Sequence, residues 1–398
     1  MRSPGKSATK AGSSNRSQAG VLDIQSSPNK PQPREASSSQ LDSAGPIIPV
    51  TQRRLVRKSW AWGALVLLLG LILYSSRGET LLSVPDYDDD DATKFVVADL
   101  PGKGKGLVAV RDIEQGELLI REKPLFRVPF SSNVFAASDP KGIIAKGLRD
   151  ASSEGRDAFL NLSYIGLPDT FDPAADPQRH ALAIFQTNAV SAGDMVGIFP
   201  RMARLNHGCA SAFNSVYSWR EREGALVVHA LKPIPEGSEL LTTYFDTKRP
   251  RDDRRRVLYW HSCTCSVCSL PEAKSRAVDR QLSDMTNEYG RLATWAEGQI
   301  TGLEAIRTVH LLWRLGTSTG YWSERGRLAA DAAWVAAAHH DERAARSWAA
   351  LAKQWYTYEL GADSAEVEET MRIMADPTSH PAWGTRQRLS VGDTRGLR

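Results

Sequence analysis

Cysteine is scarce in this sequence, and so is any excess of positive charge beyond its first sixty residues. Residues 1–59 hold ten lysines and arginines against three acidic residues, so this segment has a net charge of +7. Because the whole chain has a formal net charge of +4, the remaining 339 residues have a net charge of −3. A mildly acidic body lacks the basic surface that a nucleic-acid backbone requires. Nucleic acid is therefore not an expected partner.

A fixed sequence period is absent as well, so the Ala-, Leu- and Trp-rich helices expected after Pro271 do not predict a repeat array. The hydrophobic content of 41% is enough for a sizeable core, and 398 residues suggest two folded domains with additional segments. Residues 1–50 are rich in Ser, Pro, Asn and Gln, which is typical of a disordered tail. Short apolar segments separated by glycine turns, such as KFVVAD and GLVAV, predict strands from about Thr93 onward.

Long hydrophobic runs are missing too, apart from one short run. Trp60 to Tyr74 contains no charged residue and has aromatic residues at both ends, which is typical of a membrane interface. As a helix it spans about 22 Å, less than the roughly 30 Å of a bilayer core. We expect residues 60–76 to form a single membrane helix. The basic residues before it favour a cytosolic N-terminus, but the sequence leaves the organelle and the orientation open. The alternative is a buried core helix, with the protein in the nucleus or cytoplasm.

The four cysteines occur at two places more than fifty residues apart. Cys209 follows Asn206, His207 and Gly208, and the other three form the knuckle Cys263-x-Cys265-x-x-Cys268. A structural zinc takes four thiolate or histidine ligands in a tetrahedron. Three thiols of the knuckle leave one position open, which Cys209 fills unless His261 does. Disulfides are disfavoured, since cysteines one residue apart rarely meet the required geometry.

Four segments in this order carry a family resemblance: GKGLVAV at 104–110, RLNHGC at 204–209, EGSELLTTYFD at 236–246 and CTCSVC at 263–268. Over residues 94–270 the chain resembles the SET-domain protein-lysine methyltransferases, in particular the SET-and-MYND-like and fungal tetratricopeptide-associated branches. The cysteine-rich MYND finger is missing, because no cysteines remain for it.

The resemblance implies an α+β fold, a β-rich SET fold with a pseudo-knot and a post-SET zinc knuckle, followed by an all-α C-terminal region. A disordered N-terminal tail and the single membrane helix precede it. The expected domains are a basic tail (1–59), the membrane helix (60–76), an acidic linker (77–92), a SET domain (93–246) with a helical insert (131–187), a post-SET zinc-binding segment (247–270), a helical domain (271–376) and a tail (377–398).

The resemblance also implies roles for individual residues. Tyr244 would be the catalytic tyrosine, orienting the amine of a lysine on a protein substrate. S-adenosylmethionine would be the methyl donor and zinc a structural metal. The implied cofactor-binding residues are Gly104, Gly106, Asn188, Asn206 and His207, and the implied zinc ligands are Cys209, Cys263, Cys265 and Cys268.

The sequence departs from the family pattern at two places. The usual knot reads NHSCxPN, whereas this chain has NHGCASAFN, without the proline and with Asn214 two residues later. The stretch before the knuckle is shorter than usual, with Tyr259 and Trp260 as possible substitutes for a pocket aromatic. A catalytically inactive SET-domain scaffold or binding protein is therefore the alternative to an active lysine methyltransferase.

Overall fold

The computed structural model describes residues 93–129, 140–258 and 263–397. Its strands are β1 (Phe95–Leu100), β2 (Gly104–Ala109), β3 (Leu118–Glu122), β4 (Phe126–Pro129), β5 (Val190–Ala192), β6 (Met195–Ile198), β7 (Asn206–His207), β8 (Ser215–Arg220), β9 (Ala225–Ala230) and β10 (Glu239–Thr242). Its α-helices are α3 (Pro140–Asp150), α4 (Ser153–Leu160), α5 (Pro177–Asn188), α6 (Arg251–Val257), α7 (Glu272–Ala293), α8 (Gly302–Thr319), α9 (Arg325–Ala338), α10 (Glu342–Leu360) and α11 (Ala365–Ala375). Short 3-10 turns are η2 (Met202–Arg204), η3 (Ala210–Ala212) and η4 (Pro377–Ser379).

Three small sheets form the β-rich part, with strand orders β1-β2-β10-β7, β3-β9-β8 and β4-β6-β5. The first begins with the antiparallel β1–β2 pair, whose glycine-rich turn has Gly102 at φ +72° and Gly104 at φ +73°. This left-handed conformation is one that glycine adopts without strain. β9 is buried along its whole length, because β3 and β8 flank it and α10 packs on it.

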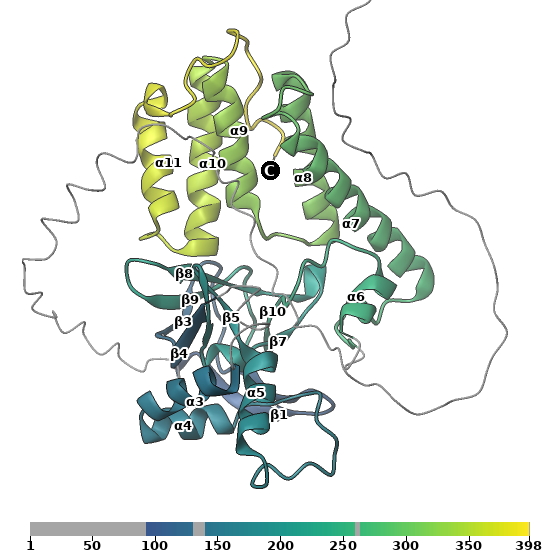
Figure 1. The fold of residues 1–398 in the computed structure, drawn as a ribbon. Coiled ribbons are helices and arrows are strands. Elements are labelled where there is room, and N and C mark those ends of the chain that lie inside the picture. Colours follow the sequence, from purple (N-terminus) through teal and green to yellow (C-terminus); the bar gives the residue numbers. More distant parts are fainter. Residues whose placement is uncertain (1–92, 130–139, 259–262, 398) are drawn as a thin grey trace, which may run out of the picture. The chain divides into compact units, whose positions relative to one another are not determined.

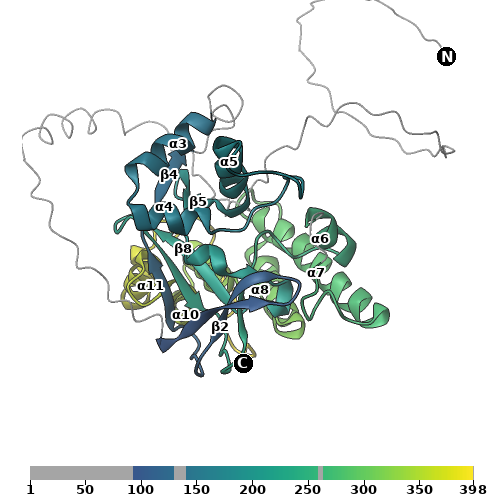
Figure 2. The same ribbon diagram turned by 90° about the horizontal axis from the view of Figure 1, so that it is seen from below.

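All the described α-helices except the short α6 fall into two groups (Figure 1). α3, α4 and α5 come from the segment between β4 and β5. They lie beside the β4-β6-β5 sheet, as the view from below also shows (Figure 2). α7 to α11 follow the sheets in the chain, and α10 packs on β8 and β9. Local sequence sets their limits: α8 starts with a capping box between Thr301 and Glu304 and ends at Gly320, at φ +66°.

The hydrophobic core has three parts. One fills the sheets around Leu107 and Ile120, and a second lies within the α3–α5 group around Phe159. The largest belongs to the C-terminal helices around Trp348, yet it also contains Phe213 and all four cysteines. The RLNHGC segment is therefore packed partly into the helical core.

The last residues of the chain, which the sequence leaves as a tail, pack on these helices. The Trp348 indole N–H donates to the Gly392 carbonyl at 3.0 Å, and the Arg386 guanidinium donates to the Trp295 carbonyl at 2.8 Å. Val391 is buried.

The fold is α+β, as expected, but the membrane helix in the fold prediction is wrong. Across residues 93–129, 140–258 and 263–397, no helix has the length and apolar character needed to cross a bilayer. The run proposed to do so, residues 60–76, lies outside the described residues. Its uncharged stretch would reach only about 22 Å as a helix, so its length already fell short of a bilayer core. The predictions of a single-pass membrane localisation and of membrane contact through residues 60–76 depended on this helix and are therefore not supported.

Candidate functional site

The knot segment (Arg204–Asn214) lies along both edges of β10. On one edge, β7 pairs in parallel with β10, matching Asn206 with Leu241, and the Gly208 N–H donates to the Thr242 carbonyl at 2.8 Å. On the other edge, the Asn214 N–H donates to the Leu241 carbonyl at 3.0 Å. This arrangement brings three predicted site residues, Asn206, His207 and Tyr244, to one end of β10.

Asn206 is fixed by its side-chain amide. Its Nδ2 donates to Glu239 Oε1 at 2.9 Å and to the Lys105 carbonyl at 3.3 Å. Lys103 Nζ forms an ion pair with the other oxygen of Glu239 at 2.5 Å. A Cβ on Gly106 would clash with Leu100 Cδ1 and stand 2.8 Å from Asn206 Nδ2, so any larger residue here would displace these side chains.

Gly104 lies in the same turn as Lys103, but its surroundings differ from those of Gly106. A Cβ at Gly104 would meet no atom within 4 Å. Its backbone therefore borders open space beside the Asn206 network, which is what a glycine turn that receives a ligand requires.

Tyr244 lies two residues beyond the end of β10. Although 46% of the residue is exposed, its hydroxyl donates to the Leu205 carbonyl at 2.9 Å. Burial of that hydroxyl raises the pKa of Tyr244 well above its usual range, and the charge of Glu239 acts in the same direction. The phenol therefore stays protonated at neutral pH and cannot act as a base.

His207 uses both ring nitrogens. Nδ1 accepts the Tyr244 backbone N–H at 3.1 Å, and Nε2 lies 3.1 Å from Cys209 Sγ. The ring stacks on Phe245, with centroids 4.9 Å apart and planes inclined by 15°. Burial lowers the pKa of His207 to about 4, so the imidazole is neutral at physiological pH.

The four cysteines form one buried cluster. Cys209, Cys263, Cys265 and Cys268 have their sulfur atoms within 4.8 Å of one another, and none forms a disulfide. Cys209 Sγ lies 3.9 Å from Cys263 Sγ and 3.6 Å from Cys268 Sγ. Four sulfurs about 2.3 Å from a tetrahedral zinc would be about 3.8 Å apart, so the donor set fits a structural zinc.

Charge around the cluster also suits a metal bound by thiolates. Hydrogen bonds among the thiols lower the pKa of Cys265 and raise the pKa of Cys209, so the cluster shares its protons until a metal displaces them. Arg254 is completely buried, with its guanidinium 4.0 Å from Cys268 Sγ and paired with Asp279 at 2.9 Å. This cation would offset the net negative charge of a four-thiolate site. The competing donor His261 lies outside the described residues.

Asn188 is not joined to the other predicted site residues by a described contact. It is the last residue of α5, and its Nδ2 donates to the Ser163 and Ile184 carbonyls, at 2.7 Å each. Its amide thus fixes the start of the α4–α5 connection, and a role in ligand binding remains a prediction.

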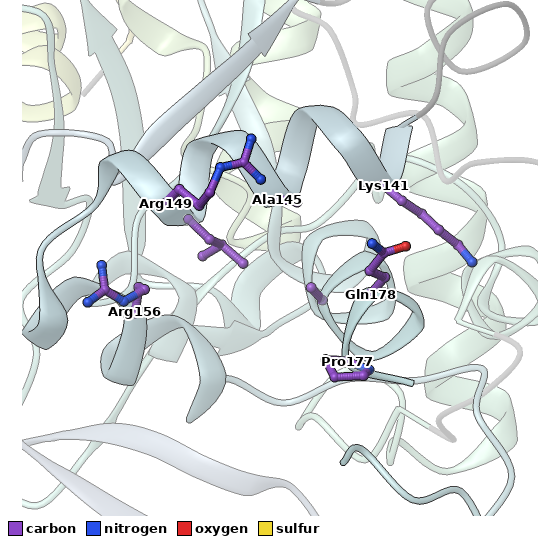
Figure 3. A pocket seen from close by; sticks show the side chains of 8 residues that line it. Lys141, Ala145, Arg149, Arg156, Pro177 and Gln178 are labelled. Carbon is purple, nitrogen blue, oxygen red and sulfur yellow. The ribbon is translucent and has the colours of Figure 1, made fainter. Parts of the chain in front are cut away.

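A cavity of about 400 Å³ opens elsewhere, among α3, α4 and α5 (Figure 3). It is lined by Lys141, Leu148, Arg149, Arg156, Gln178 and Ala181 among others, and no predicted site residue lines it. Figure 3 shows the side chains of Lys141, Arg149 and Arg156 pointing in different directions, so the three cations do not converge on one ligand position. This cavity is therefore separate from the predicted site residues.

Comparison with known proteins identifies this arrangement. The sequence pattern described as "SET domain" matches residues 104–245. Residues 104–245 form a SET domain. The resemblance drawn from the sequence is thereby confirmed for this part of the chain.

Relatives of the SET domain are similar over limited stretches. The histone-lysine N-methyltransferase set5 of Schizosaccharomyces pombe is 33% identical over 188 residues, 46% of this chain and 53% of that protein. The N-lysine methyltransferase SMYD2 of Gallus gallus is 35% identical over 91 residues, 22% of this chain and 20% of that protein. The chain thus spans about half the length of set5 and a fifth of SMYD2. The structure of Rubisco LSMT bound to AdoMet aligns with 71% of this chain and 86% of its own, at 12% identity and a TM-score of 0.32.

Two features close the altered knot of this SET domain: a glycine at position 208 beneath η3, and the hydrogen bonds of Asn214 to β10. The extra residues form η3, which folds back so that a Cβ at Gly208 would lie 2.8 Å from the Phe213 backbone nitrogen. The serine of the usual NHSC sequence would not fit there. Asn214 then closes the knot: its Oδ1 accepts the Leu241 N–H at 2.8 Å and its Nδ2 donates to the Glu239 carbonyl at 2.9 Å. Tyr259 and Trp260, the other departure, lie outside the described residues.

Three residues of this region were not singled out from the sequence. Glu239 holds Asn206, the Leu205 carbonyl holds the Tyr244 hydroxyl, and Glu122 anchors η2 just before the knot. The buried Glu122 carboxylate accepts the N–H groups of Arg201 and Met202, both at 2.9 Å. Glu239 stands in the quoted EGSELLTTY segment, but its role depends on the parallel pairing of β7 and β10, for which the sequence carries no local signal.

Proposed function

We propose that this protein is an S-adenosylmethionine-dependent protein-lysine N-methyltransferase, with Tyr244 as the catalytic residue. The observation that carries the proposal is the hydrogen bond from the Tyr244 hydroxyl to the carbonyl of Leu205, the residue that directly precedes Asn206. The similarity to proteins named histone-lysine and N-lysine methyltransferases supports lysine on a protein as the target. Zinc at the four cysteines would be structural.

When bound, S-adenosylmethionine would supply a methyl group activated by a sulfonium. The transfer is an in-line displacement, so the chain chiefly has to align the acceptor amine. Because the Tyr244 proton is directed to the Leu205 carbonyl, a lone pair of the phenol oxygen remains free to accept an N–H of the lysine amine. The lysine must arrive deprotonated, and Tyr244, with its raised pKa, orients that amine rather than removing its proton.

The cofactor side is assigned to Gly104, Gly106, Asn206 and His207, and less directly to Asn188. Among the described residues no partner is found for Asn206 Oδ1, so this oxygen is available for a ligand N–H while Nδ2 stays fixed. The ion pair between Lys103 and Glu239 ties the glycine turn to the same network.

The test uses the zinc-loaded full-length protein. Calorimetric titration should show saturable binding of S-adenosylmethionine, and tritiated methyl should pass to lysine residues of an acceptor protein array. Tyr244→Phe should lower the transfer rate by about 10²–10³-fold while cofactor binding stays intact. Tyr164→Phe, which changes an exposed tyrosine of the insert, is the matched control.

Two outcomes have different meanings. Binding without transfer to any lysine would rule out the enzyme and leave a cofactor-binding scaffold. A zinc-loaded protein that does not bind the cofactor would contradict the whole proposal and favour the inactive SET-domain alternative.

A further inference from the structure

The hydrogen bonds of His207 determine which ring nitrogen carries the proton. A backbone N–H can only donate, so Nδ1, 3.1 Å from the Tyr244 nitrogen, must be the unprotonated acceptor. In the neutral ring the proton is then on Nε2, which lies 3.1 Å from Cys209 Sγ. Sulfur is therefore the acceptor in the second bond, as a metal-bound thiolate would be.

The ring is also fixed in orientation. The Phe245 ring stacks on it almost in parallel, with ring centroids 4.9 Å apart. The Tyr244 ring is tilted against it, with ring centroids 5.3 Å apart. His207 thus spans from a member of the cysteine cluster to the backbone of Tyr244. No rotation of the ring would keep both hydrogen bonds.

We propose that the His207 side chain is a positioning residue that couples the four-cysteine metal site to Tyr244, rather than a ligand of the cofactor. Through its two hydrogen bonds it fixes the position of the Tyr244 backbone relative to Cys209. The backbone position in turn determines the position of the phenol. This inference deepens the proposed function and rests on it. It leaves only the His207 backbone for the cofactor contact implied by the family resemblance.

The two bonds can be separated by substitution, because asparagine and glutamine each imitate one nitrogen of histidine. In His207→Asn the side-chain oxygen stands near the Nδ1 position and can accept the Tyr244 N–H, but nothing reaches Cys209. In His207→Gln the longer amide stands near Nε2 and can donate to Cys209 Sγ, but the Tyr244 N–H loses its acceptor. The pair therefore serves as its own matched control.

The experiment measures three quantities on the zinc-loaded full-length variants: zinc release into a chelating dye, the amide proton shift of Tyr244 in protein labelled with ¹⁵N-tyrosine, and kcat and KM for methyl transfer. Changes around metal ligands typically alter metal affinity or activity 10–100-fold. We expect His207→Asn to release zinc about 10-fold faster while the Tyr244 amide shift stays normal. His207→Gln should hold zinc normally, shift the Tyr244 amide upfield and lower kcat about 10-fold at unchanged KM for S-adenosylmethionine.

Other results would overturn the inference. Equal loss of zinc and of the Tyr244 amide shift in both variants would reduce His207 to a packing residue. A raised KM for S-adenosylmethionine in His207→Gln, with kcat intact, would make its side chain a cofactor ligand. If the wild-type protein transfers no methyl group, the proposed function fails, while zinc release and the amide shift still decide whether His207 makes the coupling.

Discussion

The two sides of the knot segment differ in how they are held. On its sheet side, where Asn206 meets Gly104, Gly106 and Glu239 of the neighbouring strands, partly buried polar side chains are joined by hydrogen bonds and an ion pair. On its helix side (Cys209 to Phe213), Cys209, Ala210 and Phe213 are fully buried in the helical core. There, Lys232 Nζ donates to the carbonyls of Ser211 and Gly320, at 2.9 and 2.8 Å, and joins η3 to the end of α8.

This difference indicates that the two sides of the knot segment have different roles. Buried apolar contacts and metal ligands contribute to stability, whereas exposed polar pairs contribute little. Changes on the helix side should therefore lower the free energy of unfolding. Changes on the sheet side should alter cofactor binding and leave stability nearly unchanged.

The largest effect is expected from the metal site. Cys265→Ser removes one of four thiolates, so the protein should release zinc to a mild chelator and lose on the order of 5 kcal/mol of stability, part of the roughly 10–16 kcal/mol of a structural zinc. Thermal unfolding and zinc content measure this. Ser266→Ala, an exposed change in the same knuckle, should behave as wild type. Equal zinc content and Tm in Cys265→Ser would show that Cys265 is not a zinc ligand.

The cysteine cluster is also where the sequence was most informative. Four thiols in 398 residues leave few ways to complete a tetrahedral site, so Cys209 was matched with a knuckle more than fifty residues away, and the structure brings them together. The segments around Asn206 and Tyr244 were likewise recognisable, because their residues are contiguous.

What the sequence could not provide depends on contacts between distant residues. The glycine at position 208 read as a departure from the family, and its reason is the backbone of Phe213 folding over it. The carboxylate of Glu239 gains its role only when β10 lies beside β7. The short run at residues 60–76 misled for the opposite reason, since composition alone suggested a membrane helix that its length did not support.

The next effect is a pH dependence of stability, and it arises from Glu122, which anchors η2 just before the knot segment. Burial raises the pKa of Glu122 to about 7, against 4.5 ordinarily. Between these values the folded state holds a proton that the unfolded state has lost, so stability falls by about 1.4 kcal/mol per pH unit as pH rises. Glu122→Gln should remove this slope, as denaturant titrations at pH 5, 6 and 7 would measure. A slope identical to that of wild type would show that Glu122 is ionised in the folded protein.

A smaller loss of stability is expected on the helix side from restoring the usual residue of the family. In Gly208→Ser the new Cβ would lie 2.8 Å from the Phe213 nitrogen, so η3 has to shift, at a cost of about 1–3 kcal/mol. Gly290→Ser is the matched control, because a Cβ there meets no atom within 4 Å. The Tm of the two variants gives the comparison. A Gly208→Ser protein as stable as the control would mean that the knot closes as in other SET domains.

The smallest effect is expected on the sheet side. In Glu239→Gln, the amide oxygen can still accept from Asn206 Nδ2, but the ion pair with Lys103 is lost. Because this pair is partly exposed, roughly 0.5–1 kcal/mol is at stake, and we expect it as a cofactor affinity about 2–5-fold weaker with an unchanged Tm. Asp99→Asn, which breaks the exposed Lys105 pair on the same hairpin, should change neither quantity. If Glu239→Gln instead lowers the Tm as much as Gly208→Ser does, the two sides of the knot do not divide binding from stability.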